Sequence, residues 1–409
     1  MTAVALLAAT AACTGGDPPE PAVNSSCESA PGVTQGSVKV GFIYPDTGTY
    51  ASLMSPARGA VEARMAQQNE SGGVAGRQVE VEWRDDASDP GVNLSASRDL
   101  VENESAFALL QITLVSAGSA QYLDDSGVPV VGPATDVTWT QHRNMFSHSY
   151  GYGDGNTVTT FGEYVKQAGG TKAFLVDDGA GTGSLGDALE LSMQSQGITV
   201  VGQEPFSASV GSASRLADRI AASGADVLLG GILGPSFAPV VQAVNAARLP
   251  LKAILGISGY DSGLLREFGT GLAGMSVYLP YLPFESNVPA IEKFRAALLN
   301  HTPQLAETDT EAAIQAYISA DLMVRGLEAA GPCPTRGSFV AGLRAVSDYD
   351  AGGLLPGTVD MEKDFGVISP CYFFVKVDPA GQQFVPQRVA GTDNPSWCGE
   401  RLIRQSASE

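Results

Sequence analysis

Histidine and basic residues are scarce in this 409-residue sequence. No two of its three histidines, His142, His148 and His301, have the spacing of paired metal ligands, so a metalloenzyme is not expected. Lys and Arg number 24 against 44 Asp and Glu, and the resulting net charge of −20 would repel a phosphate backbone. The composition argues against nucleic-acid partners and indicates no metal ion or organic cofactor.

A long apolar run is also missing. No later segment holds the roughly 18 consecutive apolar residues of a membrane-spanning helix. The apolar stretch that opens the chain is too short to span a bilayer and is typical of a signal-peptide core. It ends in Ala11-Ala12-Cys13, which resembles a lipobox, so 1–13 is interpreted as a signal peptide and Cys13 as its lipidated residue. The protein is then anchored to the outer face of the cell membrane through a flexible tether at 14–36, with plain secretion as the alternative.

The five cysteines contain no Cys-x-x-Cys motif, which argues against a redox or zinc site. If Cys13 carries lipid, an even number remains for disulfides in an oxidising compartment: Cys27, Cys333, Cys371 and Cys398. Three pairings are possible, and the sequence does not choose among them. We take Cys333–Cys371 with Cys27–Cys398 as the working hypothesis.

The chain is long for one hydrophobic core, so two domains are expected. Order is predicted to begin at Ser37, where the apolar run 38–44 indicates a buried strand. The segment 51–69 then places Leu53 and Ala57 on one face of a helix.

From there strands and helices alternate in two series, separated by an irregular stretch at 139–155. The first series continues with strand 78–83, helix 90–103, strand 106–112, helix 116–126 and strand 128–131. The second series comprises helix 156–168, strand 172–177, helix 184–196, strand 198–201, helix 212–223, strand 226–230, helix 235–248 and strand 252–257. The remainder breaks the rhythm, with helices at 288–301, 309–330 and 337–346 and a strand at 371–377. This pattern predicts an α/β fold of two doubly wound parallel-sheet lobes.

Open parallel sheets bind ligands beyond the carboxyl ends of their strands, beside helix N-termini. The corresponding segments are 46–50, 113–116 and 133–136 in the first lobe and 178–184, 232–234 and 258–261 in the second. Ser116 suits two roles equally, as the cap of the following helix or as a ligand contact. Thr135 ends its strand, which favours ligand contact.

The strongest sign of an enzyme is the G-x-G-x-x-G motif of the Gly181–Gly186 loop, with Glu204 at the distance of a ribose-binding acid. The motif begins five residues after Val176, whereas a dinucleotide fingerprint starts at the strand end. A secreted protein also has no pool of NAD. A secreted enzyme with a nucleotide site is therefore the third-ranked interpretation.

Several motifs taken together resemble a known family. They are Gly41-Phe42-Ile43, the segments 69–77 and 85–90, Gly127-Val128-Pro129, Ala134-Thr135, Pro356 and Phe373-Phe374-Val375. The sequence resembles, over about 37–378, the leucine/isoleucine/valine-binding type (type I) of periplasmic solute-binding proteins of bacterial ABC transporters. The resemblance implies two lobes joined by a three-segment hinge. Lobe 1 would comprise 37–138 plus about 284–348, and lobe 2 would comprise 139–283 plus about 349–400.

The resemblance also implies a ligand site in the cleft between the lobes. A hydroxyl residue after the third strand and the Ala-Thr after the fourth grip a carboxylate in this family. The resemblance assigns ligand contacts to these positions and to positions after the other strands. The expected contacts are Tyr50, Thr113, Ser116, Ala134, Thr135, Thr182, Ile232, Ser258 and Tyr260. Amino-acid binders carry a carboxylate where this chain has Ser258. A buried ammonium without a counter-charge is costly, so amino acids are disfavoured unless Asp46, Asp178 or Asp261 substitutes.

The expected function is therefore that of an extracytoplasmic solute-binding protein, not an enzyme. As a monomer, it would capture a small polar ligand by lobe closure and pass it to an ABC permease. The ligand is expected to be branched-chain amino acid-like, a carboxylate or an amide. A ligand-sensing module for a membrane receptor is the alternative.

Overall fold

The first lobe is built on a sheet of five parallel strands in the order β2-β1-β3-β4-β5. The computed structural model describes residues 30–151, 157–177, 183–305 and 308–402. The strands are β1 (Ser37–Tyr44), β2 (Gln78–Asp85), β3 (Ala108–Gln111), β4 (Val130–Val131) and β5 (Met145–Phe146). β1 and β3 are almost wholly buried because helices cover both faces of the sheet.

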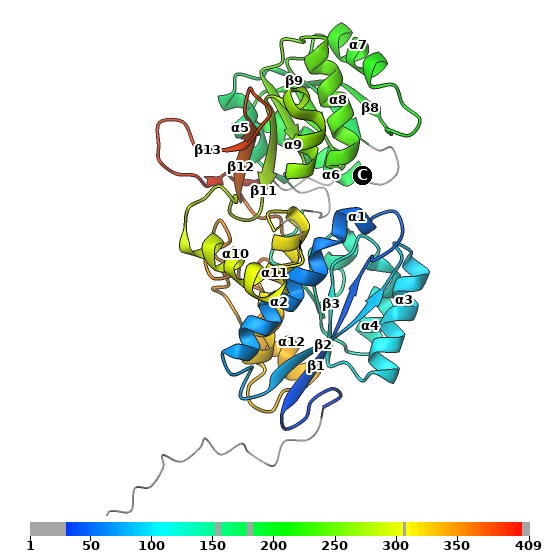
Figure 1. The fold of residues 1–409 in the computed structure, drawn as a ribbon. Helices are drawn as coiled ribbons and strands as arrows, with labels where there is room; N and C mark the ends of the chain where they lie inside the picture. Colours follow the sequence, from blue (N-terminus) through cyan, green and yellow to red (C-terminus); the bar gives the residue numbers. More distant parts are fainter. Residues whose placement is uncertain (1–29, 152–156, 178–182, 306–307, 403–409) are drawn as a thin grey trace, which may run out of the picture.

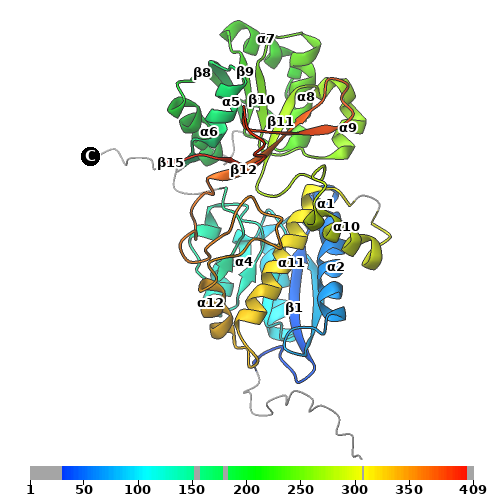
Figure 2. The same ribbon diagram turned by 90° about the vertical axis from the view of Figure 1, so that its left-hand side faces the viewer.

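Helices from two distant parts of the sequence cover this sheet. The N-terminal part supplies α1 (Ala51–Met54), α2 (Pro56–Glu70), α3 (Pro90–Arg98) with a π-helical extension at Asp99–Asn103, and α4 (Ala117–Asp125). The C-terminal part supplies α10 (Pro289–His301), α11 (Glu311–Ala329) and α12 (Arg336–Arg344). Figure 2 shows α11 lying along α2 and β1. The helix expected at 51–69 is divided at Ser55 because Pro56, which has no N–H to donate, begins α2.

The second lobe contains a mixed sheet in the order β13-β12-β11-β10-β9-β7-β8, with β14 paired to β12. Its parallel strands are β7 (Lys172–Asp177), β8 (Thr199–Pro205), β9 (Val227–Gly230), β10 (Ala253–Gly256) and β11 (Met275–Leu279). The antiparallel additions are β12 (Cys371–Val377), β13 (Phe384–Gln387) and β14 (Trp397–Cys398). Its helices are α5 (Thr160–Gln167), α6 (Gly183–Ser195), α7 (Ala213–Ser223), α8 (Gly234–Ala246) and α9 (Ser262–Phe268). A separate two-stranded ladder joins β6 (Thr157–Val158) to β15 (Arg401–Leu402).

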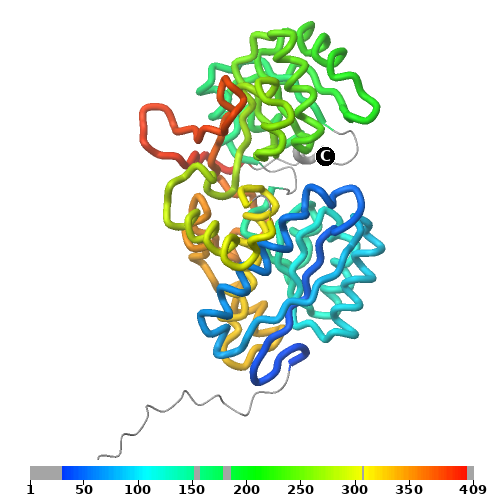
Figure 3. The backbone as a smooth tube through the Cα atoms, viewed as in Figure 1, coloured from blue at the N-terminus to red at the C-terminus, as the bar shows by residue number. Residues whose placement is uncertain are grey.

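The two-lobed α/β architecture confirms the predicted fold class, and Figure 3 shows the chain crossing between lobes. The crossings follow β5, β11 and α12. The first comes later than the expected boundary at residue 138, because β5 pairs with β4 and buried Trp139 packs in the first-lobe core. Beyond the expected limit at 348, Tyr349 still belongs to the first lobe, because its hydroxyl donates to the carbonyl oxygen of Ile318 in α11.

The expected disulfide pairing is wrong. Cys371 is bonded to Cys398, because the antiparallel pairing of β12 with β14 places these two residues opposite each other. Cys333 is also disulfide-bonded. The expected signal peptide and most of the tether, including Cys13 and Cys27, lie outside the described residues.

The described chain begins at the pole of the first lobe that faces away from the second lobe (Figure 1). Among the described helices, none is long and apolar enough to cross a membrane.

Candidate functional site

A cavity of about 520 Å³ lies between the lobes. It is lined by the α1–α2 turn, the loops after β3 and β4 and the N-terminal turns of α11 from the first lobe, and by the loops after β9 and β10 and the end of β11 from the second. Most of its wall is apolar, including Leu53, Met54, Ile112, Leu114, Leu233, Ile257, Leu264, Leu279 and Leu305. Its volume falls within the range of small-molecule sites, roughly 300–1,000 Å³.

Ala134, Thr135 and Ser258 are the predicted residues that line this cavity. The N–H of Ala134 donates to Ser147 Oγ at 3.0 Å, and Thr135 Oγ1 donates to the carbonyl oxygen of Thr113 at 3.2 Å. Ser258 Oγ accepts a hydrogen bond from the N–H of Gly234 at 2.8 Å, in the first turn of α8. The strand-end rule therefore located part of the cavity wall in both lobes.

Thr113 and Ser116 are fully buried and do not line the cavity. Ser116 Oγ accepts from the indole N–H of Trp139 at 2.9 Å and makes no capping bond to α4. Thr113 Oγ1 accepts from the N–H of Val115 at 3.2 Å. These hydroxyls stabilise the loop after β3, so neither expected role of Ser116 is observed.

Three further predicted contacts, Tyr50, Ile232 and Tyr260, also lie away from the cavity lining. Ile232 is a core residue, and the hydroxyl of buried Tyr260 donates to the Glu285 carboxylate while accepting from the N–H of Phe284. Tyr50 is partly exposed, and its backbone N–H donates to Ser88 Oγ. Thr182 lies outside the described residues.

Glu204, the acid considered for a ribose, forms an ion pair with Arg219 at 2.6 Å. The start of the Gly181–Gly186 loop, on which the nucleotide interpretation also depends, lies outside the described residues.

The polar side chains that sequence reasoning missed come from the start of α11. Thr310 caps this helix by accepting from the N–H of Ala313, and Glu311 is the first helical residue. Glu311 Oε1 accepts from the N–H groups of Gly259 and Tyr260 in the second lobe, at 3.0 and 2.7 Å. Burial raises the pKa of the Glu311 carboxyl group to about 7. An acid after a capping Thr is ordinary for a helix start, so only the tertiary structure reveals its second role.

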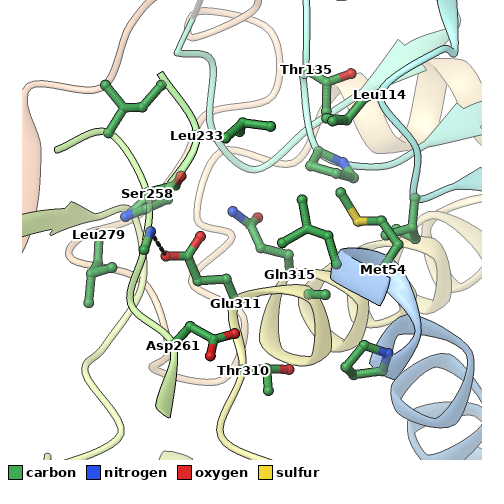
Figure 4. A pocket seen from close by; sticks show the side chains of 18 of the residues that line it. Met54, Leu114, Thr135, Leu233, Ser258, Asp261, Leu279, Thr310, Glu311 and Gln315 are labelled. Atoms are coloured by element: carbon green, nitrogen blue, oxygen red, sulfur yellow. Dashed lines mark hydrogen bonds between the residues drawn. The ribbon is translucent and has the colours of Figure 1, made fainter. Parts of the chain in front are cut away.

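Two further polar groups complete this end of the cavity. Asp261 lines it and caps α9, with Oδ1 accepting from the N–H groups of Gly263 and Leu264. Gln315 lies one helical turn after Glu311, and its buried Oε1 has no hydrogen-bond partner. Figure 4 shows Ser258, Asp261 and Glu311 on one side of the cavity, Leu114 and Thr135 on the opposite side, and Gln315 between them.

Basic residues are absent from the described lining. The cavity therefore combines an apolar wall with an acidic, acceptor-rich end.

Comparisons with known proteins agree with this architecture. A family model described as "Periplasmic binding protein" matches residues 37–382. "Leu/Ile/Val-binding protein homolog 3" of Brucella melitensis is 24% identical over 83% of this chain and 91% of that protein. "Leu/Ile/Val-binding protein BraC3" of Rhizobium johnstonii is 24% identical over 72% of this chain and 80% of its own length.

Two solved structures share the fold. A "Fatty acid ABC transporter substrate-binding protein" from Thermomonospora curvata aligns with a TM-score of 0.72 at 19% identity, covering 92% of this chain and 96% of the other. A solute-binding protein of an R. palustris ABC transporter, in complex with benzoate, aligns with a TM-score of 0.69 at 19% identity, covering 89% and 98%. Since the family match spans most of the sequence and both lobes, this chain belongs to the periplasmic binding protein family.

Proposed function

We propose that this protein is the solute-binding component of an ABC importer, which captures one small molecule between its lobes and presents it to a membrane permease. The observation that carries the proposal is the 520 Å³ cavity lined by both lobes. A solute that contacts both walls binds the closed arrangement more tightly than an open one, and this difference drives closure. Membership of a binding-protein family supports this function over catalysis.

The lining favours a ligand with a substantial hydrocarbon part. Met54 and Leu114 contribute apolar surface from the first lobe, and Leu233 contributes it from the second. Burial of such surface stabilises a complex by about 25 cal/mol per Å² of apolar area, while the polar groups fix orientation. This lining supports an amphipathic solute over the small polar ligand expected from the sequence.

A cavity-filling substitution tests the proposed site. Leu233 is 36% exposed in the unliganded structure, so Leu233→Trp can enlarge the side chain with little disturbance of the core. We expect the variant to keep the melting temperature of the unliganded parent and to lose ligand-induced stabilisation in a thermal-shift screen of small metabolites.

Val210→Trp is the matched control, because Val210 is 86% exposed and does not line the cavity. It should retain the full ligand response. Equal ligand-induced shifts in the parent and the Leu233→Trp protein would place the ligand elsewhere and refute the site.

A further inference from the structure

Two of the hydrogen-bond donors expected to hold a ligand carboxylate already donate within the protein, and the expected hydroxyl after the third strand is buried away from the cavity. The N–H of Ala134 donates to Ser147 Oγ, and the hydroxyl of Thr135 donates to the Thr113 carbonyl. The hydroxyl of Ser116 is fully buried beside Trp139. An anionic group entering the cavity at this loop would have to displace these internal bonds.

The charge around the cavity is also unfavourable for an anion. Asp261 and Glu311 both line it, and no described lining residue is basic. A ligand carboxylate would be desolvated near like charges with no counter-ion, which opposes binding.

Hydrogen-bond acceptors, in contrast, are available to a ligand in this cavity. Both described hydrogen bonds of Glu311 are made by Oε1, so Oε2 remains for a ligand. The buried Oε1 of Gln315 has no partner, and a buried polar atom without a partner is costly unless a ligand or water satisfies it. Since Glu311 and Gln315 are four residues apart on α11, both side chains lie on one helix face (Figure 4).

We infer that the ligand is an amphipathic amine without a free carboxylate, whose ammonium group binds between Glu311 and Gln315. Its hydrocarbon body lies against Met54, Leu114 and Leu233. This inference rests on the proposed solute-binding function and names the class of solute. The acid that the family places at position 258 is thereby replaced by one from the start of α11, on the other lobe.

A panel of ligands matched in body and different in head group tests the inference. Isopentyl, hexyl and phenethyl bodies are each supplied with ammonium, carboxylate, zwitterionic amino-acid and hydroxyl heads, and thermal shift and calorimetry are measured at pH 8. We expect the best amine to bind at least about tenfold more tightly than its matched carboxylate and zwitterion, because a charge-assisted contact is lost or reversed in these.

The variant Glu311→Gln keeps an acceptor for Gly259 and Tyr260 but removes the charge. It should weaken binding of the best amine by at least about tenfold and leave the matched alcohol nearly unchanged. Glu292→Gln is the control, since Glu292 is an exposed acid in the first turn of α10 and should leave both ligands unaffected. Circular dichroism and the unliganded melting temperature establish that each variant is folded.

A carboxylate or zwitterion that binds as tightly as its matched amine would overturn the inference, as would equal amine affinity in the parent and the Glu311→Gln protein. If Leu233→Trp abolished the binding of that carboxylate or zwitterion, the ligand would still occupy the cavity between the lobes. The proposed solute-binding function would then stand, and only the ligand class would be wrong. Failure of every head group to bind would count against both.

Discussion

At the scale of single residues, His148 is a buried base without a hydrogen-bond partner. It is 3% exposed, and neither ring nitrogen has a partner in the structure. Burial lowers the pKa of His148 to about 4. It lines a second, smaller cavity beside Ser149, Pro280 and Pro356, where the three crossings meet. Its charge state is therefore linked to the stability of the hinge region.

We predict acid destabilisation through His148. Between about pH 6.5 and 4 the unfolded chain binds a proton at this residue and the folded chain does not. The free energy of unfolding therefore falls as the pH falls, by about 3 kcal/mol over this pH range. His148→Phe should remove this loss, measured as the difference between urea unfolding curves of parent and variant at pH 7 and pH 4. An identical pH dependence in the two proteins would contradict the prediction.

Glu311 changes the free energy of unfolding with pH in the opposite direction, over an overlapping pH range. Because burial raises the pKa of Glu311 to about 7, the folded state retains a proton that the unfolded state releases, and stability falls as the pH rises from about 4.5 to 7. Comparing parent and His148→Phe, which share Glu311, cancels this contribution. Asp261 and Tyr281 are the other ionisable groups that interact electrostatically with Glu311.

At the scale of elements, the Cys371–Cys398 disulfide fastens β14 to β12. The bond closes a chain segment with a sequence separation of 27, and the chain-entropy relation assigns about 3.5 kcal/mol to a loop of that length. The double substitution Cys371→Ser with Cys398→Ser should lower the free energy of unfolding by about that amount, observed as a lower urea midpoint. A midpoint equal to that of the parent would show that strand pairing alone stabilises this edge.

Apolar periodicity predicted the long elements well, because strands such as β7 and helices such as α11 carry enough residues to show their period. The sequence pattern did not predict β11 and α9, which are short and follow the loop after β10. The pairing of β14 with β12 depends on tertiary contacts, and so the disulfide pairing could not be predicted. In the site, the strand-end rule found Thr135 and Ser258 but not Glu311, which starts a helix supplied from another part of the chain.

At the scale of the whole molecule, attachment to the membrane through Cys13 remains a prediction of the sequence. In a bacterial host that processes the natural signal segment, the parent should fractionate with membranes and Cys13→Ser should be found in the soluble extracytoplasmic fraction. Mass spectrometry of the mature N-terminus should detect a diacylglycerol group on the parent alone. An unlipidated parent protein would contradict the prediction and support plain secretion.

The described chain enters the first lobe at the pole turned away from the second lobe. If Cys13 is fixed in the membrane, segment 14–29 allows that pole a reach of at most roughly 55 Å at full extension. An anchored protein would therefore stay close to the membrane surface. If the proposed importer function holds, a permease within that distance would be met at a local concentration set by the length of this segment.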